Sequence, residues 1–153
     1  MAWFQNLRAQ YLVARNRTSE AARIYREVLR SDPIHVPGIF VVLSDCRTRG
    51  AVDEAIDVAT RALAVDGEHF MALQTLAWAY VTQENHSAAR VAVANALEQF
   101  RAQHLDEPSR TLHAIDVLRP SASGCLRSPL AEDVAASLRD WKRWAESYLK
   151  SQA

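Results

Sequence analysis

The chain has 153 residues, of which 49% are hydrophobic and 24% are charged, and its basic and acidic residues balance to a formal net charge of zero. This length allows one domain with a real core, and the composition is that of an ordinary soluble globular protein. A neutral chain gives no global reason to expect nucleic acid or an anionic membrane as a partner. No stretch approaches the roughly 18 apolar residues of a membrane-spanning helix, and the N-terminus does not resemble a signal peptide, so we expect a cytoplasmic protein.

Apolar residues at helical spacing predict a series of short helices. The first carries a stripe of Phe4, Leu7, Tyr11 and Ala14. Thr18 or Ser19 can cap the second through a side-chain oxygen. Asp32-Pro33 ends that second helix, because proline lacks an N–H donor and restricts the residue before it. Its predicted buried residues are Ala21, Ile24, Tyr25, Val28 and Leu29.

The same unit is then predicted twice more. Helices are expected over 37–49 and 52–64, joined by a permissive turn at Gly50, and over 69–83 and 86–103. Helices this short are marginal alone in water, so stacking of neighbouring pairs must stabilise them.

The pattern weakens after residue 103. A helix over 106–118 would place Leu112, Ile115 and Leu118 on one face, and 119–129 is the clearest loop. A last amphipathic helix from Pro129 to about Lys150 would cap the array with its polar face outward. Its apolar stripe comprises Leu130, Val134, Leu138, Trp141, Ala145 and Tyr148.

Charge and cysteine are distributed unevenly. Residues 1–30 hold six Arg and two Glu, whereas 51–70 hold one Arg and five acidic residues. We interpret both stretches as solvated helical faces. Cys46 and Cys125 lack disulfide or metal-ligand spacing, which favours a reducing compartment. Cys46 falls in the apolar register of its helix, so we expect a buried inert thiol, whereas Cys125 falls in the loop and is the candidate reactive thiol.

Equivalent residue types recur at intervals of 34, which is typical of a helical repeat array. The clearest set is Ala21, Ala55 and Ala89, and the others include Val28, Ala62 and Ala96, then Leu29, Leu63 and Leu97.

With these positions, residues 2–103 resemble three tetratricopeptide repeats, at about 2–35, 36–69 and 70–103. The third unit matches the family best, with Leu73, Leu76, Ala77 and Tyr80 followed by Ala89, Val93 and Ala96. Gln5 and Arg8 stand where the family has apolar residues, so the first helix is predicted to be a partly exposed end. The resemblance implies a single all-α domain, a right-handed α-solenoid in which 104–153 is either a degenerate fourth unit or a separate extension.

In this family the first helices of the units line a concave groove that holds partner peptides or helices. The resemblance places Trp3, Asn6, Gln10, Val13, Phe40, Ser44, Arg47, Met71, Gln74, Trp78 and Val81 in that groove. Trp78 could equally pack beneath the C-terminal helices. Met71, Thr75 and Val41 replace the residues with which some members clamp a terminal carboxylate, so we expect an apolar segment or amphipathic helix as the ligand.

We therefore expect a non-catalytic protein-interaction module, a scaffold, adaptor or small chaperone, without nucleic acid or membrane insertion; self-association is left open. The alternatives are a secretion-type chaperone for an apolar segment, or a regulatory subunit or array of a larger enzyme. Five histidines form no HxxxH or HExxH pair, and four glycines form no phosphate loop. Asp53-Glu54 and Asp106-Glu107 are adjacent rather than facing pairs. We expect no enzyme, cofactor or metal site.

Overall fold

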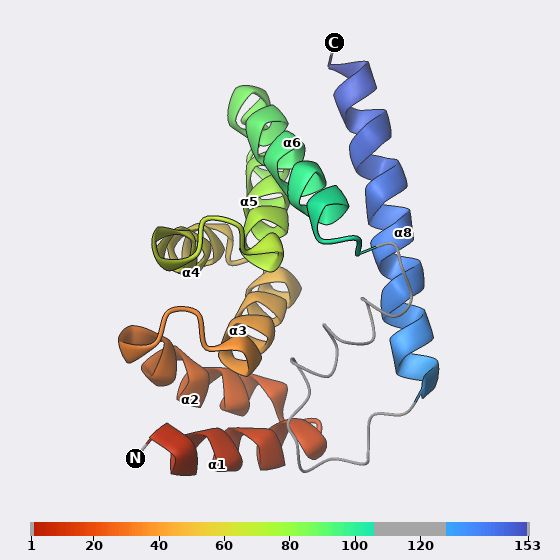
Figure 1. The fold of residues 1–153 in the computed structure, drawn as a ribbon. Coiled ribbons are helices and arrows are strands. Elements are labelled where there is room, and N and C mark those ends of the chain that lie inside the picture. Colours follow the sequence, from red (N-terminus) through yellow and green to blue (C-terminus); the bar gives the residue numbers. More distant parts are fainter. Residues whose placement is uncertain (1, 106–127, 153) are drawn as a thin grey trace. The chain divides into compact units, whose positions relative to one another are not determined.

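The computed structural model describes residues 2–105 and 128–152, and every regular element in these ranges is an α-helix (Figure 1). The chain divides into two compact units, Met1–Thr75 and Leu76–Ala153, which we describe separately as the N-terminal and C-terminal units. The predicted helix over 106–118, most of the predicted loop that follows it, and Cys125 lie outside the described residues.

The N-terminal unit contains four complete helices and the start of a fifth. They are α1 (Ala2–Ala14), α2 (Thr18–Ser31), α3 (Val36–Arg49), α4 (Val52–Val65) and the first turns of α5 (Phe70–Thr82). The rest of α5, α6 (His86–Ala102) and α8 (Ser128–Ser151) belong to the C-terminal unit. Each of these helices was predicted from the apolar period, with ends that differ by at most two residues.

The local backbone recurs at the 34-residue interval of the sequence. Asn16, Gly50 and Glu84 each follow the first helix of a pair and have positive φ, at 59°, 68° and 57°. The next residue in each turn donates its N–H to the carbonyl four residues before the left-handed position, over 2.8, 2.8 and 3.0 Å. Only Gly50 adopts this conformation without a Cβ penalty. The three turns therefore share one backbone conformation, and only the second has glycine, the residue best suited to it.

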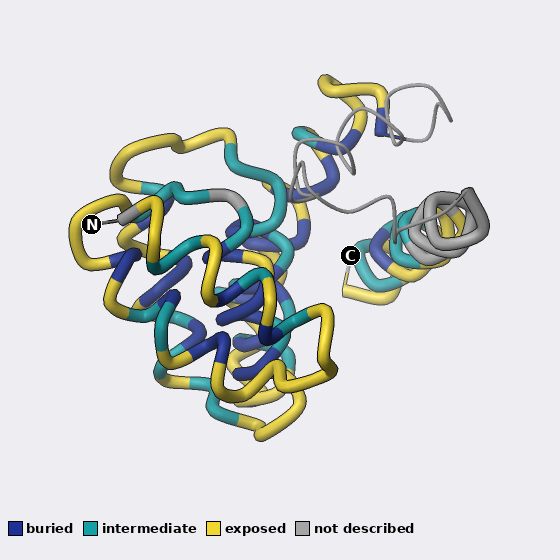
Figure 2. Tube along the Cα trace, turned by 90° about the horizontal axis from the view of Figure 1, so that it is seen from below, coloured by how far each residue is buried: buried dark blue, intermediate teal, exposed yellow. Residues whose placement is uncertain are grey.

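Small residues make the close contacts of the N-terminal unit. Ala21 and Ala55, two of the recurring alanines, are fully buried, as predicted. Gly38 on α3 lies at a close approach, because a Cβ there would be 3.1 Å from His35 and 3.3 Å from both Leu29 and Tyr25. Figure 2 shows the buried residues where neighbouring helices face one another. Small side chains let helix axes approach closely, which is the packing that the repeated alanines predicted.

The start of α2 differs from the prediction. The N-cap is Arg17, whose side chain does not cap the helix, so neither Thr18 nor Ser19 is the cap. Ser19 instead donates its hydroxyl to Asp45 on α3, 3.4 Å away. The Ser19 hydroxyl thus makes a contact between helices in place of the expected contact within its own helix. At α6, by contrast, the Asn85 side chain accepts from the Ala88 N–H and caps the helix.

The first helix shows a larger difference. Its predicted apolar stripe of Phe4, Leu7, Tyr11 and Ala14 is exposed, and the buried residues are Ala9 and Leu12 on the other side. The reason is that α1 packs on α2 and contributes little else to the unit. A helix with one neighbour buries one narrow face, so the prediction of a partly exposed first helix is confirmed while its apolar stripe faces outward.

In the C-terminal unit α6 and α8 pack on each other. Ala145 of α8 is fully buried in a cluster with Val93 and Leu97 of α6. Trp141 and Tyr148 of the predicted α8 stripe pack against this cluster, so that part of the stripe is confirmed. The side chains of Leu130 and Val134 lie outside what the structure describes.

Candidate functional site

The predicted binding face of α3 is a narrow stripe along the buried middle of the helix. From Ile39 to Cys46 every residue is buried except Phe40 and Ser44. Phe40 is 43% exposed, Ser44 is half-buried, and Arg47 is exposed. These positions are four and three residues apart, so they lie above one another on one side of the helix. The stripe, Phe40, Ser44 and Arg47, presents an aromatic ring, a hydroxyl and a guanidinium to the surroundings.

On α1 the predicted groove residues Asn6, Gln10 and Val13 are half-buried. The Asn6 side-chain oxygen accepts a hydrogen bond from the Tyr25 hydroxyl over 3.0 Å and lies 3.4 Å from His35 Nε2. Asn6 therefore joins α1 to α2 and to the start of α3. Burial raises the pKa of Tyr25 to about 12, so its hydroxyl stays a donor at physiological pH.

The predicted residues on α5 fall in both units. Met71 and Gln74 belong to the N-terminal unit, and Trp78 and Val81 belong to the C-terminal unit. All four are half-buried. The structure thus describes the predicted groove as two separate sets of residues.

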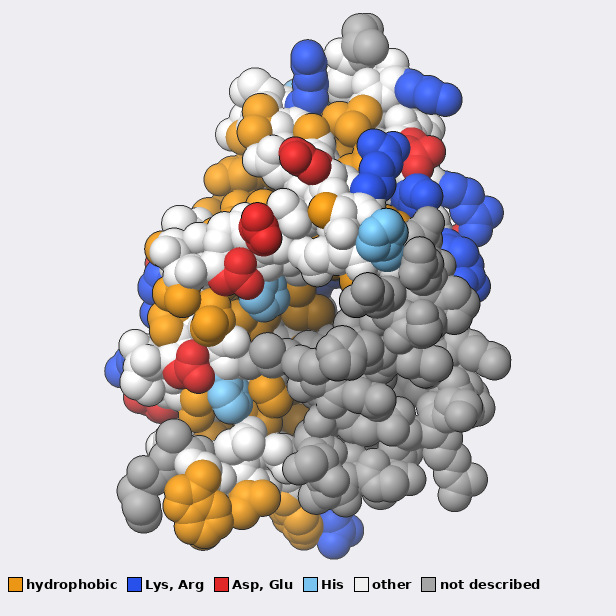
Figure 3. Space-filling view, in the orientation of Figure 1, with side chains coloured by type: hydrophobic (Ala, Val, Ile, Leu, Met, Phe, Trp, Pro, Cys, Tyr) orange, Lys and Arg blue, Asp and Glu red, His pale blue; other side chains and the backbone are white. Residues whose placement is uncertain are grey.

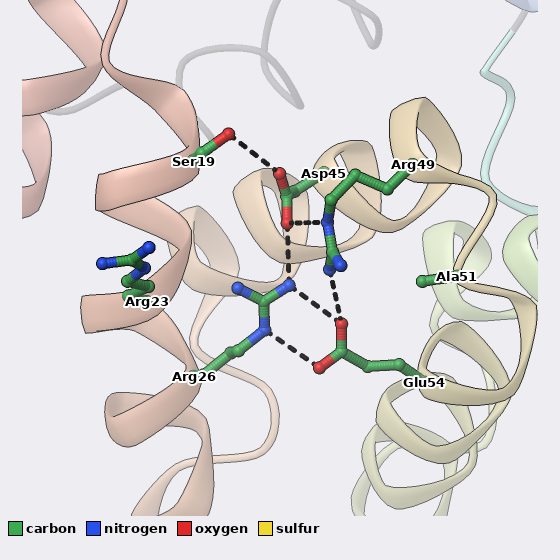
Figure 4. A pocket seen from close by; sticks show the side chains of 7 residues that line it. All are labelled: Ser19, Arg23, Arg26, Asp45, Arg49, Ala51 and Glu54. Carbon is green, nitrogen blue, oxygen red and sulfur yellow. Dashed lines mark hydrogen bonds and ion pairs between the residues drawn. The ribbon is translucent and has the colours of Figure 1, made fainter.

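Sequence reasoning missed a cluster of charged side chains that joins three helices of the N-terminal unit. Arg26 of α2 forms a bidentate pair with Glu54 of α4, at 2.9 and 2.8 Å, and its Nη2 also lies 2.7 Å from Asp45 Oδ2 of α3 (Figure 4). Arg49 donates to Asp45 over 2.9 Å and to Glu54 over 3.0 Å. We call Arg26, Asp45, Arg49 and Glu54 the charge cluster.

Opposite charges control ionisation in the charge cluster. The hydrogen bonds from Arg26 outweigh the effect of burial and lower the pKa of Glu54 from 4.5 to about 2. Burial acts to raise the pKa of Asp45, which is only 6% exposed, but hydrogen bonds from Arg26 and Arg49 bring it below its usual value. Both carboxylates are therefore ionised at neutral pH, and the cluster is a set of paired charges.

Cys46 borders this cluster and is buried, as predicted. Its thiol donates to Glu54 Oε1 over 3.1 Å. Burial, followed by the neighbouring carboxylate, raises the pKa of Cys46 to about 12. A protonated, enclosed thiol is a poor nucleophile.

A surface hollow of about 440 Å³ opens beside the charge cluster, and its rim includes Ser19, Arg23 and Ala51. The acceptor positions of the two carboxylates are already occupied: Glu54 Oε1 accepts from Arg26, Arg49 and Cys46, and Asp45 Oδ2 accepts from Arg26 and Arg49. Their chemistry is therefore that of a clamp between helices. No group of three or more His, Cys, Asp and Glu in the described ranges could hold a metal ion.

One sequence signal pointed toward the charge cluster. Arg26 comes from the basic stretch 1–30 and Glu54 from the acidic stretch 51–70, which we interpreted as two solvated faces. That interpretation is wrong for these two residues, because they are partly buried and paired with each other. Opposite local charge in adjacent units was the signal, but the residues that meet depend on the crossing of α2 and α4.

The remaining candidates are local. His69, at the start of α5, accepts a hydrogen bond from the Ala72 N–H over 3.3 Å and so caps that helix. His86 is exposed at the start of α6. None of the helices in the described part of the chain has the length and apolar character to cross a membrane.

No family model matches the chain, and no curated protein shows significant similarity to it.

Proposed function

We propose that the chain is a non-catalytic protein-binding module of the tetratricopeptide type. In this proposal three helix pairs stack as a right-handed solenoid, and the C-terminal helix caps it. The partner is a peptide or amphipathic helix that docks on a concave face lined by α1, α3 and α5. The charge cluster then has a structural role and holds successive helices at their packing angles.

The observation that carries this proposal is the α3 stripe. Between Ile39 and Cys46, where every other residue of α3 except Ser44 is buried, Phe40 is 43% exposed, with Ser44 and Arg47 on the same side of the helix. An exposed aromatic next to a guanidinium is the composition that binding hot spots favour. Because α3 belongs to the middle pair of the proposed array, its open side would lie at the centre of the groove.

The recurring backbone supports the repeat type. Helices begin at residues 2, 36 and 70 and at residues 18, 52 and 86, all at intervals of 34. The turns at Asn16, Gly50 and Glu84 share one conformation. Stacked units of equal geometry form extended concave surfaces, and repeat proteins use these surfaces to bind other proteins.

The test is a selection from a displayed library of peptides with the intact chain as bait. Affinities of enriched peptides for the wild-type protein and for Phe40→Ala would be measured by fluorescence anisotropy. If Phe40 is an anchor, Phe40→Ala should weaken binding by about tenfold or more. Val65→Ala, which truncates an exposed apolar side chain at the end of α4, is the matched control and should leave affinity unchanged.

Peptides that bind Phe40→Ala as tightly as the wild type would place the site elsewhere and reject the α3 face. Arg47→Gln provides a second reading of the same surface. It should weaken peptides that carry acidic residues more than neutral ones, because electrostatic complementarity acts on partner choice.

A further inference from the structure

The outer face of α1 carries four of the eight exposed large hydrophobic side chains of the described residues. Trp3 is 68% exposed, Phe4 55%, Leu7 48% and Tyr11 55%. Phe4, Leu7 and Tyr11 recur at spacings of three and four residues, and Trp3 precedes Leu7 by four, so they form one stripe, opposite the buried Ala9 and Leu12. Figure 3 shows hydrophobic side chains at the surface along α1, with a basic side chain beside them. We call Trp3, Phe4, Leu7 and Tyr11 the α1 face.

An exposed apolar stripe of this kind is costly in water and is typical of an interaction site. Side chains of the α1 face also contact one another and a neighbouring guanidinium group. The rings of Trp3 and Phe4 meet edge to face at 6.1 Å, and the Arg15 guanidinium lies over the Tyr11 ring, 5.3 Å from its centroid. All three aromatic residues of this face thus contact another ring or a guanidinium group, and a preformed surface loses less entropy on binding.

The charged residues of α1 and of the turn that follows it have one sign. Residues 1–19 contain Arg8, Arg15 and Arg17 and no acidic residue. Arg17 is paired with Glu20 at 2.6 Å. Arg8 and Arg15 form no salt bridge with a carboxylate of the described residues, and both are exposed. The stripe is therefore bordered by two guanidinium groups that lack a salt-bridge partner within the described part of the chain.

This charge decides between two occupants of the face. A second copy packed through α1 would bring Arg8 and Arg15 of both chains to one interface without an acidic residue of that helix to compensate. Like charges at an interface disfavour the pairing. A partner helix with Asp or Glu beside its apolar stripe would instead neutralise both guanidinium groups.

We infer that the α1 face docks an amphipathic helix of another protein, whose apolar stripe is flanked by acidic residues. The four apolar side chains span nine residues, or about 12 Å of helix, which fits two to three turns of a partner with anchors at positions i, i+3 or i+4, and i+7. Trp3 was also assigned to the predicted groove, but Phe4, Leu7 and Tyr11 lie outside it, so the inference does not depend on the proposed function.

The probe is a synthetic helical peptide of about 18 residues with a Leu stripe flanked by Glu, compared with a peptide in which every Glu is Lys. Binding to the intact protein would be measured by fluorescence anisotropy at low and physiological salt. The acidic peptide should bind at least about tenfold more tightly than the Lys peptide, and this preference should shrink with salt because exposed charges are screened.

Two variants locate the contact. Leu7→Ser, in the middle of the stripe, should weaken the acidic peptide by about tenfold. Arg8→Gln with Arg15→Gln should remove the preference over the Lys peptide while leaving weak apolar binding. Val91→Ser is the matched control, because Val91 is an exposed apolar residue on α6. Circular dichroism melts would show that each variant keeps the wild-type fold.

Equal affinity for the acidic and Lys peptides would overturn the inference. So would loss of binding in Phe40→Ala with no effect of Leu7→Ser, which would assign the peptide to the α3 stripe. Sedimentation that shows a wild-type dimer and a monomeric Leu7→Ser variant would make the second copy the occupant, and would also overturn it. If the peptide selection shows that Phe40 does not contribute to binding, the expected results for the α1 face stay the same. The two proposals are therefore tested separately.

Discussion

The charge cluster yields the sharpest prediction about stability. It joins α2, α3 and α4 through Arg26, Asp45, Arg49 and Glu54, and its strongest geometry is the bidentate pair between Arg26 and Glu54. Replacing Arg26 by Met keeps most of the alkyl stem, and replacing Glu54 by Gln keeps the shape of the side chain. The two single variants and the double variant form a double-mutant cycle that isolates the energy of this pair.

The magnitude follows from the pKa of Glu54. A fall from 4.5 to about 2 corresponds to about 3.4 kcal/mol of interaction with all its partners, at 1.36 kcal/mol for each pKa unit. Glu54 is 37% exposed, so water screens part of this energy. Part of the remaining interaction energy of Glu54 comes from its contacts with Arg49 and Cys46 rather than with Arg26. We therefore expect a coupling energy of about 1–1.5 kcal/mol between Arg26 and Glu54.

Arg26→Met alone should cost more than this coupling energy, about 2–3 kcal/mol. The reason is that Asp45, only 6% exposed, also loses its contact with Arg26 at 2.7 Å. Urea unfolding followed by circular dichroism would give the free energy of unfolding of each variant. The exposed pair of Asp57 and Arg61 on α4, at 2.9 Å, is the matched control, and its cycle should give no more than about 0.5 kcal/mol.

The same measurement has a pH dependence with a definite sign. The folded state lowers the pKa of Glu54, so between about 2 and 4.5 the unfolded chain binds the proton more readily. The stabilisation is complete above pH 4.5 and is lost as the pH falls towards 2. The stability difference between wild type and Glu54→Gln should shrink over that range. A coupling energy no larger than that of the control pair, or a difference that persists at pH 2, would refute the reasoning.

Three further predictions concern packing and reactivity. Ala55→Leu should destabilise the fold by about 1–3 kcal/mol through overpacking, because Ala55 is fully buried. Ala64→Leu, at an exposed site of the same helix, is the control and should be nearly neutral in thermal melts. Equal melting temperatures of the two variants would remove the basis for the alanine register. Cys46 should resist iodoacetamide at pH 8 in the folded protein and react in urea, as mapped by mass spectrometry; rapid labelling of folded protein would contradict the buried thiol. Trp141→Ala should cost about 2–3 kcal/mol, because Trp141 packs on the α6–α8 cluster, and more than Trp144→Ala at a more exposed position; the reverse order in urea unfolding would contradict that packing.

The local structure of this chain could be predicted from its sequence. Helix periods, the proline after Asp32 and the glycine at position 50 depend on torsions and contacts within a few residues. The recurrence of Ala21 and Ala55 also indicated where helices approach closely, and both residues are buried. Such features can be predicted from the sequence because they depend on residues that are close together along the chain.

The direction of each face and the charge cluster depended on tertiary structure. The period of α1 specifies a stripe of Phe4, Leu7 and Tyr11, but only the packing of the opposite side of α1 on α2 shows that this stripe faces outward. Arg26 and Glu54 are 28 residues apart, and they meet because α2 and α4 bring them within 2.8 Å. Which long side chains meet depends on the angle and position at which two helices cross. That crossing results from many packing contacts together, so it cannot be read from individual residues in the sequence.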